Sequence, residues 1–176
     1  MFKPTCVTRN YDGNNLEITF WVVQNSSSTI HDTFYADAYW FNGDTITSGN
    51  RDYLTIAWYP YTSVLSGSNH VQATSSYGTD PASLVALSPS QVTYSTPDNA
   101  YSYFPLDQFE TWVTIVSDVS PNNPTGGMAA AGYTQTWVAY NFSFSVGYPS
   151  GAAVTVSPGG GHNLWLTNNV NWAAHA

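Results

Sequence analysis

The chain has two glutamates, Glu17 and Glu110, and each lies in a stretch that alternates between apolar and polar residues. Hydrolysis of a glycosidic bond uses two carboxyl groups that flank the scissile bond. The sequence places aromatic residues close to both glutamates, and such rings can hold a sugar. Any two strand carboxylates would satisfy this pattern, and a solvated outward face is the simpler explanation. Catalysis by Glu17 and Glu110 is therefore a minor hypothesis.

Oxygen-rich side chains in turns could bind calcium, which accepts ligands from Asp, Asn and backbone carbonyls. The best group is Asp118 with Asn122 and Asn123, and a weaker group begins at Asp12. Asp and Asn are also common in turns that hold no metal, because their side chains bond to nearby backbone. Neither group has the spacing of an EF-hand. Calcium is the one cofactor for which the sequence offers ligands.

Three tryptophans are predicted to point away from the apolar face of their own strands: Trp21, Trp137 and Trp165. An exposed indole can stack on the C–H face of a sugar ring while neighbouring polar groups, such as Asn141, bond to its hydroxyls. Exposed tryptophans are also enriched at subunit interfaces. They could instead fill a second core. The sequence leaves these three interpretations open.

Other catalytic and metal-binding patterns are missing from the sequence. The histidines His31, His70, His162 and His175 show no pair at metal-ligand spacing, and no Gly-x-Ser-x-Gly motif is present. Cys6 is the single cysteine, so the chain can form no internal disulfide.

Positive charge is almost absent. Lysine and arginine together number 3, the formal net charge is −8, and 8% of residues are charged, against about a quarter in an ordinary domain. Nucleic-acid binding needs clustered cations that displace counterions from phosphates, so we exclude nucleic acid as a partner. No apolar stretch reaches the roughly 18 residues of a membrane span. The chain also shows no apolar signal-peptide segment, so we expect either a cytoplasmic protein or a mature secreted or virion protein.

Alternating apolar and polar residues predict strands over most of the chain. In one stretch Leu16, Ile18, Phe20 and Val22 share one face. The expected strands are Cys6–Asn10, Leu16–Gln24, Ile30–Phe41, Thr45–Thr47, Tyr53–Tyr59, His70–Ser75, Gln91–Tyr94, Phe109–Val116, Thr134–Val146, Ala152–Ser157 and Asn163–Thr167.

Two long loops are predicted, at residues 77–106 and 117–132, where proline or glycine recurs among polar residues. Within the first loop we expect a helical turn at Ala82–Leu87 and only the short strand Gln91–Tyr94. Long ordered loops in a compact domain are often functional. Both loops are therefore candidate functional segments.

These elements predict a single all-β domain over residues 1–176. About eight to ten strands, with hairpins early and long crossings later, favour a two-sheet antiparallel β-sandwich of jelly-roll or Greek-key type. A closed eight-stranded barrel is the alternative.

The charge pattern and the outward tryptophans favour a non-enzymatic, lectin-like protein that binds a glycan. The alternative is a structural subunit that assembles with identical copies, such as a single-jelly-roll viral capsid or appendage protein. A small glycosidase ranks below both. The low charge also leads us to expect a homo-oligomer.

Overall fold

The computed structural model describes the strands and one long middle segment of the chain. Side chains are described for residues 16–23, 31–41, 51–59, 62–97, 106–116, 127–136, 167 and 170. The described residues are 5–11, 14–24, 31–41, 51–59, 62–97, 106–116, 127–136, 144–146, 154–156, 162–167 and 170–172.

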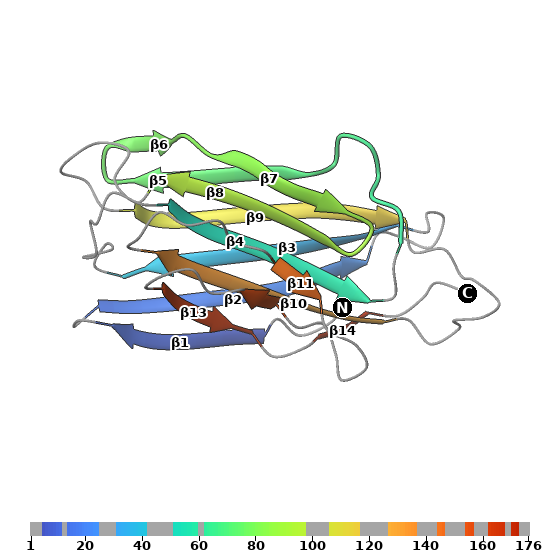
Figure 1. Cartoon of the computed structure of the whole chain (residues 1–176), viewed down its shortest axis with the longest axis horizontal. Helices are drawn as coiled ribbons and strands as arrows, with labels where there is room; N and C mark the ends of the chain where they lie inside the picture. Colours follow the sequence, from blue (N-terminus) through green and yellow to red (C-terminus); the bar gives the residue numbers. More distant parts are fainter. Residues whose placement is uncertain are drawn as a thin grey trace.

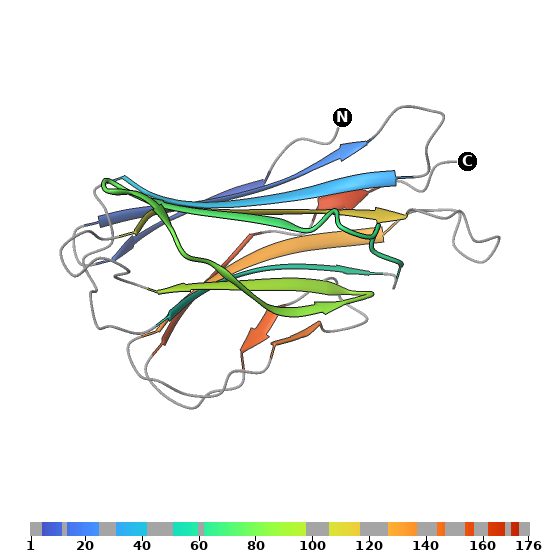
Figure 2. The same cartoon turned by 90° about the horizontal axis from the view of Figure 1, so that it is seen from above.

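Two antiparallel sheets pack face to face (Figures 1 and 2). The first sheet has, in spatial order, β1 (Thr5–Tyr11), β2 (Asn14–Gln24), β3 (His31–Trp40), β9 (Leu106–Val116), β5 (His70–Ser75) and β6 (Gly78–Asp80). The second has β13 (His162–Leu166), β10 (Gly127–Thr136), β4 (Arg51–Tyr59), β8 (Gln91–Pro97) and β7 (Ser83–Ser88), and β14 (Val170–Trp172) also pairs with β10. A separate pair consists of β11 (Phe144–Val146) and β12 (Val154–Val156).

This arrangement confirms the predicted β-sandwich. The barrel alternative is not supported, because within the described strands no sheet closes on itself. The described residues include no helix with the length and apolar character needed to cross a membrane.

The first sheet has one buried and one outward face, as its alternating sequence predicts. On β2 the side chains of Leu16, Ile18, Phe20 and Val22 are buried, whereas those of the intervening residues are half-buried. Strand β9 alternates in the same way along its second half. The apolar faces of both sheets meet in one core, whose largest side chains are Trp40, Trp58, Tyr133, Phe20, Phe34 and Phe109.

Strands β8 and β10 of the second sheet are buried on both faces along most of their length. Every residue of β10 from Ala129 to Thr136 is buried, and so is every residue of β8 from Val92 to Thr96. Strand β12 lies against β4 and β10, on the face turned away from the first sheet (Figure 2). Polar residues on that covered face bond to each other, as when the hydroxyl oxygens of Thr55 and Thr93 lie 2.9 Å apart.

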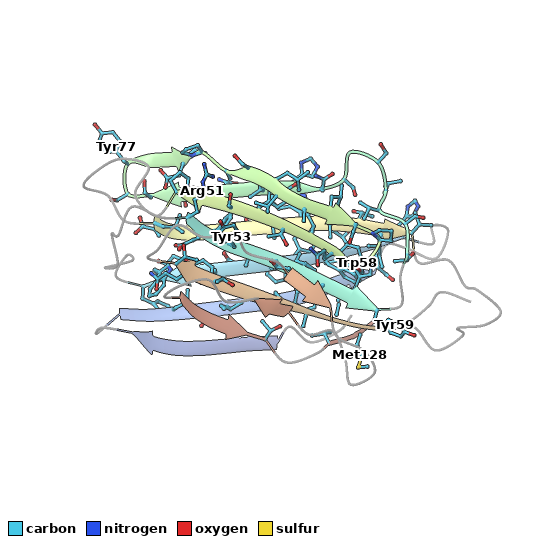
Figure 3. The ribbon with its side chains drawn as sticks, in the orientation of Figure 1. Arg51, Tyr53, Trp58, Tyr59, Tyr77 and Met128 are labelled. Atoms are coloured by element: carbon cyan, nitrogen blue, oxygen red, sulfur yellow. The ribbon has the colours of Figure 1, made fainter. Side chains whose placement is uncertain are left out.

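A buried hydrogen-bond network near the start of β4 includes a carboxylate and joins the two sheets through the Tyr133 hydroxyl. The hydroxyl of Tyr133 donates to Oδ2 of the fully buried Asp52, and the backbone N–H of Thr136 donates to Oδ1 at 3.4 Å. Nε1 of Trp40 on the first sheet donates to the same Tyr133 hydroxyl at 3.3 Å. Figure 3 shows this end of β4, marked by Arg51 and Tyr53, and the opposite end, marked by Trp58 and Tyr59.

The segment predicted as loop 77–106 was the main error. The strand predicted at Gln91–Tyr94 is confirmed as part of β8, but the segment also contains β6 and β7, and the helical turn predicted at Ala82–Leu87 is instead mostly strand β7. Figure 2 shows the chain descending here from the first sheet to the second along one side of the sandwich. Strand β7 was missed because its apolar residues do not alternate.

The second predicted loop, 117–132, was also too long, because β10 already begins at Gly127, while residues 117–126 lie outside the described part of the chain. The single strand predicted at Thr134–Val146 is divided. Its first residues end β10, and its last residues form β11 in another sheet.

Candidate functional site

The outward face of the first sheet carries a row of aromatic side chains that crosses β2, β3, β9 and β5. Trp21 is the register partner of Tyr35, Tyr35 is the partner of Trp112, and Trp112 is the partner of His70. Directly paired residues of an antiparallel sheet point to the same face. We call these four side chains the aromatic row.

Neighbouring rings of the aromatic row are stacked. The centroids of Trp21 and Tyr35 are 5.1 Å apart with an interplanar angle of 4°. Those of Tyr35 and Trp112 are 6.3 Å apart at 24°, and those of Trp112 and His70 are 5.2 Å apart at 28°. Aromatic pairs prefer such offset stacking. The stacked rings therefore form a continuous row, in which Trp21, Tyr35 and Trp112 are half-buried and His70 is exposed.

A second row lies two residues further along the same strands and carries polar groups. It consists of Thr19, Asp37, Glu110 and Gln72, which are paired in register across β2, β3, β9 and β5. Oγ1 of Thr19 also donates to a carboxylate oxygen of Glu17 at 3.3 Å. We call these four residues the polar row.

A third set of outward residues borders the polar row. Glu17, Tyr39 and Gln108 are paired in register there, and Nε2 of Gln108 donates to Oδ1 of Asp37 at 3.0 Å. Carboxylates and amides are thus fixed beside the aromatic row by the regular register of the sheet.

The carboxyl groups of the polar row are harder to ionise than usual. Burial raises the pKa of Asp37, the hydrogen bond from Gln108 opposes this, and the charge of Glu17 adds to the rise. Burial also raises the pKa of Glu110, and the charge of Asp37 raises it further. Asp37 and Glu110 face each other directly, and two like charges in that position disfavour each other.

Replacing Glu110 by Gln should increase stability slightly at neutral pH. When folding raises the pKa of a carboxyl group, ionising that group costs more free energy in the folded state than in the unfolded state. The protein is therefore less stable at neutral pH than it would be with the group protonated, and this stability returns as the pH falls. We expect a gain of a few tenths of a kcal/mol for E110Q at pH 7, since Glu110 is partly exposed. Urea unfolding at pH 7 and near pH 4 checks this: the gain should shrink in acid, and a gain that grew there would contradict it.

The structure brings together some of the residues predicted from sequence. Glu17, Trp21 and Glu110 share the outward face of the first sheet. Asp37 lies between the two glutamates, because β3 separates β2 from β9. The predicted pair is thus two strands apart and two residues out of register, roughly 12 Å, whereas directly opposed Asp37 and Glu110 have Cβ atoms about 5 Å apart.

Other predicted residues cannot be placed on this face. Trp165 lies on β13 in the second sheet, where it pairs with Tyr133 of β10, and the side chain of Trp165 is not described. The remaining predicted residues lie outside the described part of the chain, namely Trp137 and Asn141 of the tryptophan site and Asp118, Asn122 and Asn123 of the calcium site. Among the described residues, no group of three or more His, Cys, Asp or Glu side chains could hold a metal ion.

Sequence reasoning missed Tyr35, Asp37, Trp112 and His70 as members of the site. The outward direction of Trp112 was visible in the alternation of its strand, opposite to Val113. What the sequence did not show is that β9 lies between β3 and β5, which makes these four residues neighbours.

The chain is thus an antiparallel β-sandwich whose first sheet carries aromatic and acidic side chains on its outward face. No family model and no curated protein matches the chain. A solved structure from work on pH-induced modulation of Streptococcus parasanguinis adhesion by Fap1 fimbriae is similar, with a TM-score of 0.44 and 9% identity over 99% of this chain and 91% of that one. Clostridium perfringens delta-toxin is similar at a TM-score of 0.35 and 8% identity, over 94% of this chain and 87% of that one.

Proposed function

We propose that the protein binds a carbohydrate on the outward face of its first sheet. The observation that supports this is the parallel course of the aromatic row and the polar row, held in one register across β2, β3, β9 and β5. A sugar has an apolar C–H face and hydroxyl groups at its rim. Rings next to fixed carboxylates and amides match both parts at once.

The charges of the face favour a neutral glycan. Glu17, Asp37 and Glu110 accept hydrogen bonds from hydroxyls, and the amides of Gln72 and Gln108 can both donate and accept. No lysine or arginine belongs to the described strands β2, β3, β9 and β5. A sugar acid would therefore meet carboxylates with no lysine or arginine of these four strands to compensate, so neutral hexoses and their oligomers are the expected class.

The length of the face favours an oligosaccharide over a single sugar. Strands in a sheet lie about 4.8 Å apart, so the aromatic row extends over about 14 Å from β2 to β5. The rings are already stacked on each other without a ligand, an arrangement expected to lower the entropy lost on binding. We expect the ligand to run across the strands, along both rows.

Trp112 is the residue to test, because its ring lies between those of Tyr35 and His70. Replacing Trp112 by Ala should weaken binding of a neutral oligosaccharide about 30-fold, the loss typical of an aromatic hot spot. Titration calorimetry after a screen of neutral glycans provides the measurement. Thermal unfolding of the variant shows whether it is folded, and Trp112→Leu replaces it if it is not.

A matched control uses Tyr77, whose side chain is 65% exposed and projects outward near β6 (Figure 3). Tyr77 follows the Ser75 end of β5, whereas His70 of the aromatic row is at the other end of that strand. Tyr77→Ala should bind like the original protein. The proposal is wrong if no neutral glycan binds at millimolar concentration, or if Trp112→Ala and Tyr77→Ala bind equally well.

A self-assembling structural subunit is the second candidate function, and the exposed apolar side chains of β7 favour it. Leu84 is 48% exposed, Val85 47% and Leu87 43%. Such side chains in an end strand are unusual in a protein that stays alone. The two functions can coexist, since β7 belongs to the second sheet and the aromatic row to the first.

A further inference from the structure

Strand β7 is the end strand of the second sheet, next to β8. Natural end strands are usually protected from pairing with other molecules by charged side chains, prolines or bulges. The sequence from Pro81 to Pro97 contains no charged residue at all. The only protection within β7 is an irregularity in its register with β8, between Leu84 and Ala86.

That irregularity places two leucines on one face of the strand. Leu84 is the register partner of Tyr94, and Leu87 is the partner of Val92. Tyr94 and Val92 both point into the core. The bulge therefore turns Leu84 and Leu87 toward the space between the sheets, although three positions separate them in sequence.

The two leucines are nevertheless about half exposed, with Leu84 at 48% and Leu87 at 43%. The hydrophobic core thus extends to an open border at β7. Adding another strand beside β7 would remove this apolar surface from water and would satisfy the backbone groups on the outer edge of the strand.

The sequence of β7 reads nearly the same in both directions: Ser83, Leu84, Val85, Ala86, Leu87, Ser88. A two-fold interface places the same surface on both molecules, so residue i meets j and j meets i. With the axis between Val85 and Ala86, antiparallel pairing would place serine opposite serine and leucine opposite leucine. A second copy of this strand would therefore pair serine with serine, leucine with leucine and Val85 with Ala86, apolar against apolar.

We propose that β7 pairs antiparallel with β7 of a second copy of this chain, which joins the second sheets of two molecules into one sheet. The neutral character of the segment favours this partner, because two chains of net charge −8 can meet here without bringing carboxylates together. Pro81 and Pro89 limit the pairing to the six residues of β7. The inference does not depend on carbohydrate binding.

A single short strand pair buries less than the roughly 1,000 Å² of a stable interface. Dimerisation should therefore be reversible, with a dissociation constant of about 1–100 μM. Sedimentation equilibrium over that concentration range should show the mass rising from 19.2 kDa toward twice that value. A protein that stays monomeric, or one that grows into open assemblies, overturns the closed two-fold pairing.

Val85→Lys tests the surface directly, since it places a charge next to the axis in both molecules. Dimerisation should weaken about tenfold or more. The matched control is Leu65→Lys, which changes a leucine of similar exposure, 38%, outside β7. Dimerisation of Val85→Lys at the original strength would show that a different surface pairs.

A cross-linking experiment tests the register and does not depend on Val85→Lys being folded. In a Cys6→Ser background, Leu84→Cys and Leu87→Cys are prepared separately and then mixed under mild oxidation. The register places residue 84 opposite residue 87 of the second copy, so the mixture should form disulfide dimers several-fold faster than either variant alone. Equal rates in the mixture and in the separate samples would overturn the proposed register.

Discussion

Phe34→Ala should lower the free energy of unfolding by about 3–5 kcal/mol, the range measured for truncating a buried phenylalanine. Phe34 is 0% exposed, and its ring lies 6.1 Å from that of Phe20 on the neighbouring strand and 5.8 Å from that of Trp58 on the opposite sheet. It therefore connects the two layers. A domain of this kind has about 5–15 kcal/mol of stability in total, so the loss would leave it close to unfolding.

The matched control lies on the same strand. Tyr39 points outward from β3 and is 40% exposed, so Tyr39→Ala should cost less than about 1 kcal/mol. Urea unfolding of both variants, followed by tryptophan fluorescence, gives the two values. Similar losses would mean that the two faces of β3 do not differ as the sandwich requires.

Strand positions and face directions were largely readable from the sequence where one face is buried and the other wet. The alternation along Leu16–Gln24 predicted the buried and outward residues of β2 correctly. The prediction that Trp112 and Val113 point to opposite faces of β9 was also confirmed, since Val113 is buried and Trp112 is half-buried. In both strands the side-chain period of two carries the information, because water contacts one face only.

The same reasoning failed where that contrast disappears. In residues 83–88 the apolar side chains of Leu84, Val85 and Leu87 do not alternate with polar ones, so the pattern resembled a helical turn. The bulge between Leu84 and Ala86 explains how such a sequence still forms a strand. Strand β10 is buried on both faces from Ala129 to Thr136, so polar residues no longer mark the outside. Burial by a third layer and a register irregularity are tertiary effects that a local pattern does not contain.

The candidate site depends on strand order even more than on strand position. Trp21 and Tyr35 come from consecutive strands, so their contact follows from a simple hairpin-like pairing. Trp112 and His70 join them only because β9 inserts between β3 and β5 after the chain has passed through the second sheet. Periodicity predicts which way a side chain points, and long-range pairing decides which residues it meets.

The abundance of aromatic residues thus divides into two physical roles. Phe34 packs against Phe20 on the neighbouring strand and Trp58 on the opposite sheet, and these rings supply core packing. Trp21 and Trp112, with the rings next to them, form an ordered outer surface. That surface also carries the carboxyl groups of Glu17, Asp37 and Glu110, so the proposed carbohydrate site would combine stacking on the rings with hydrogen bonds to carboxylates and amides.

Tyr133→Phe should lower the free energy of unfolding by about 2–4 kcal/mol, although it removes a single oxygen atom. The Tyr133 hydroxyl donates to the fully buried carboxylate of Asp52 and accepts from Nε1 of Trp40 at 3.3 Å. Hydrogen bonds to charged groups contribute about 1.5–3 kcal/mol, and a buried group that loses its partner also retains its desolvation cost. The variant therefore weakens one connection within the second sheet and one between the sheets.

Tyr94→Phe is the matched control, because the Tyr94 hydroxyl accepts from Nδ2 of Asn69 at 2.7 Å, a neutral partner at a partly exposed site. Its removal should cost about 1 kcal/mol. Urea unfolding at pH 7 compares the two variants. Equal losses would show that the charge and burial of Asp52 add nothing to the Tyr133 hydrogen bond, whereas a larger loss for Tyr133→Phe would support the hydrogen bonds from Trp40 to Tyr133 and from Tyr133 to Asp52 as a buried polar link between the sheets.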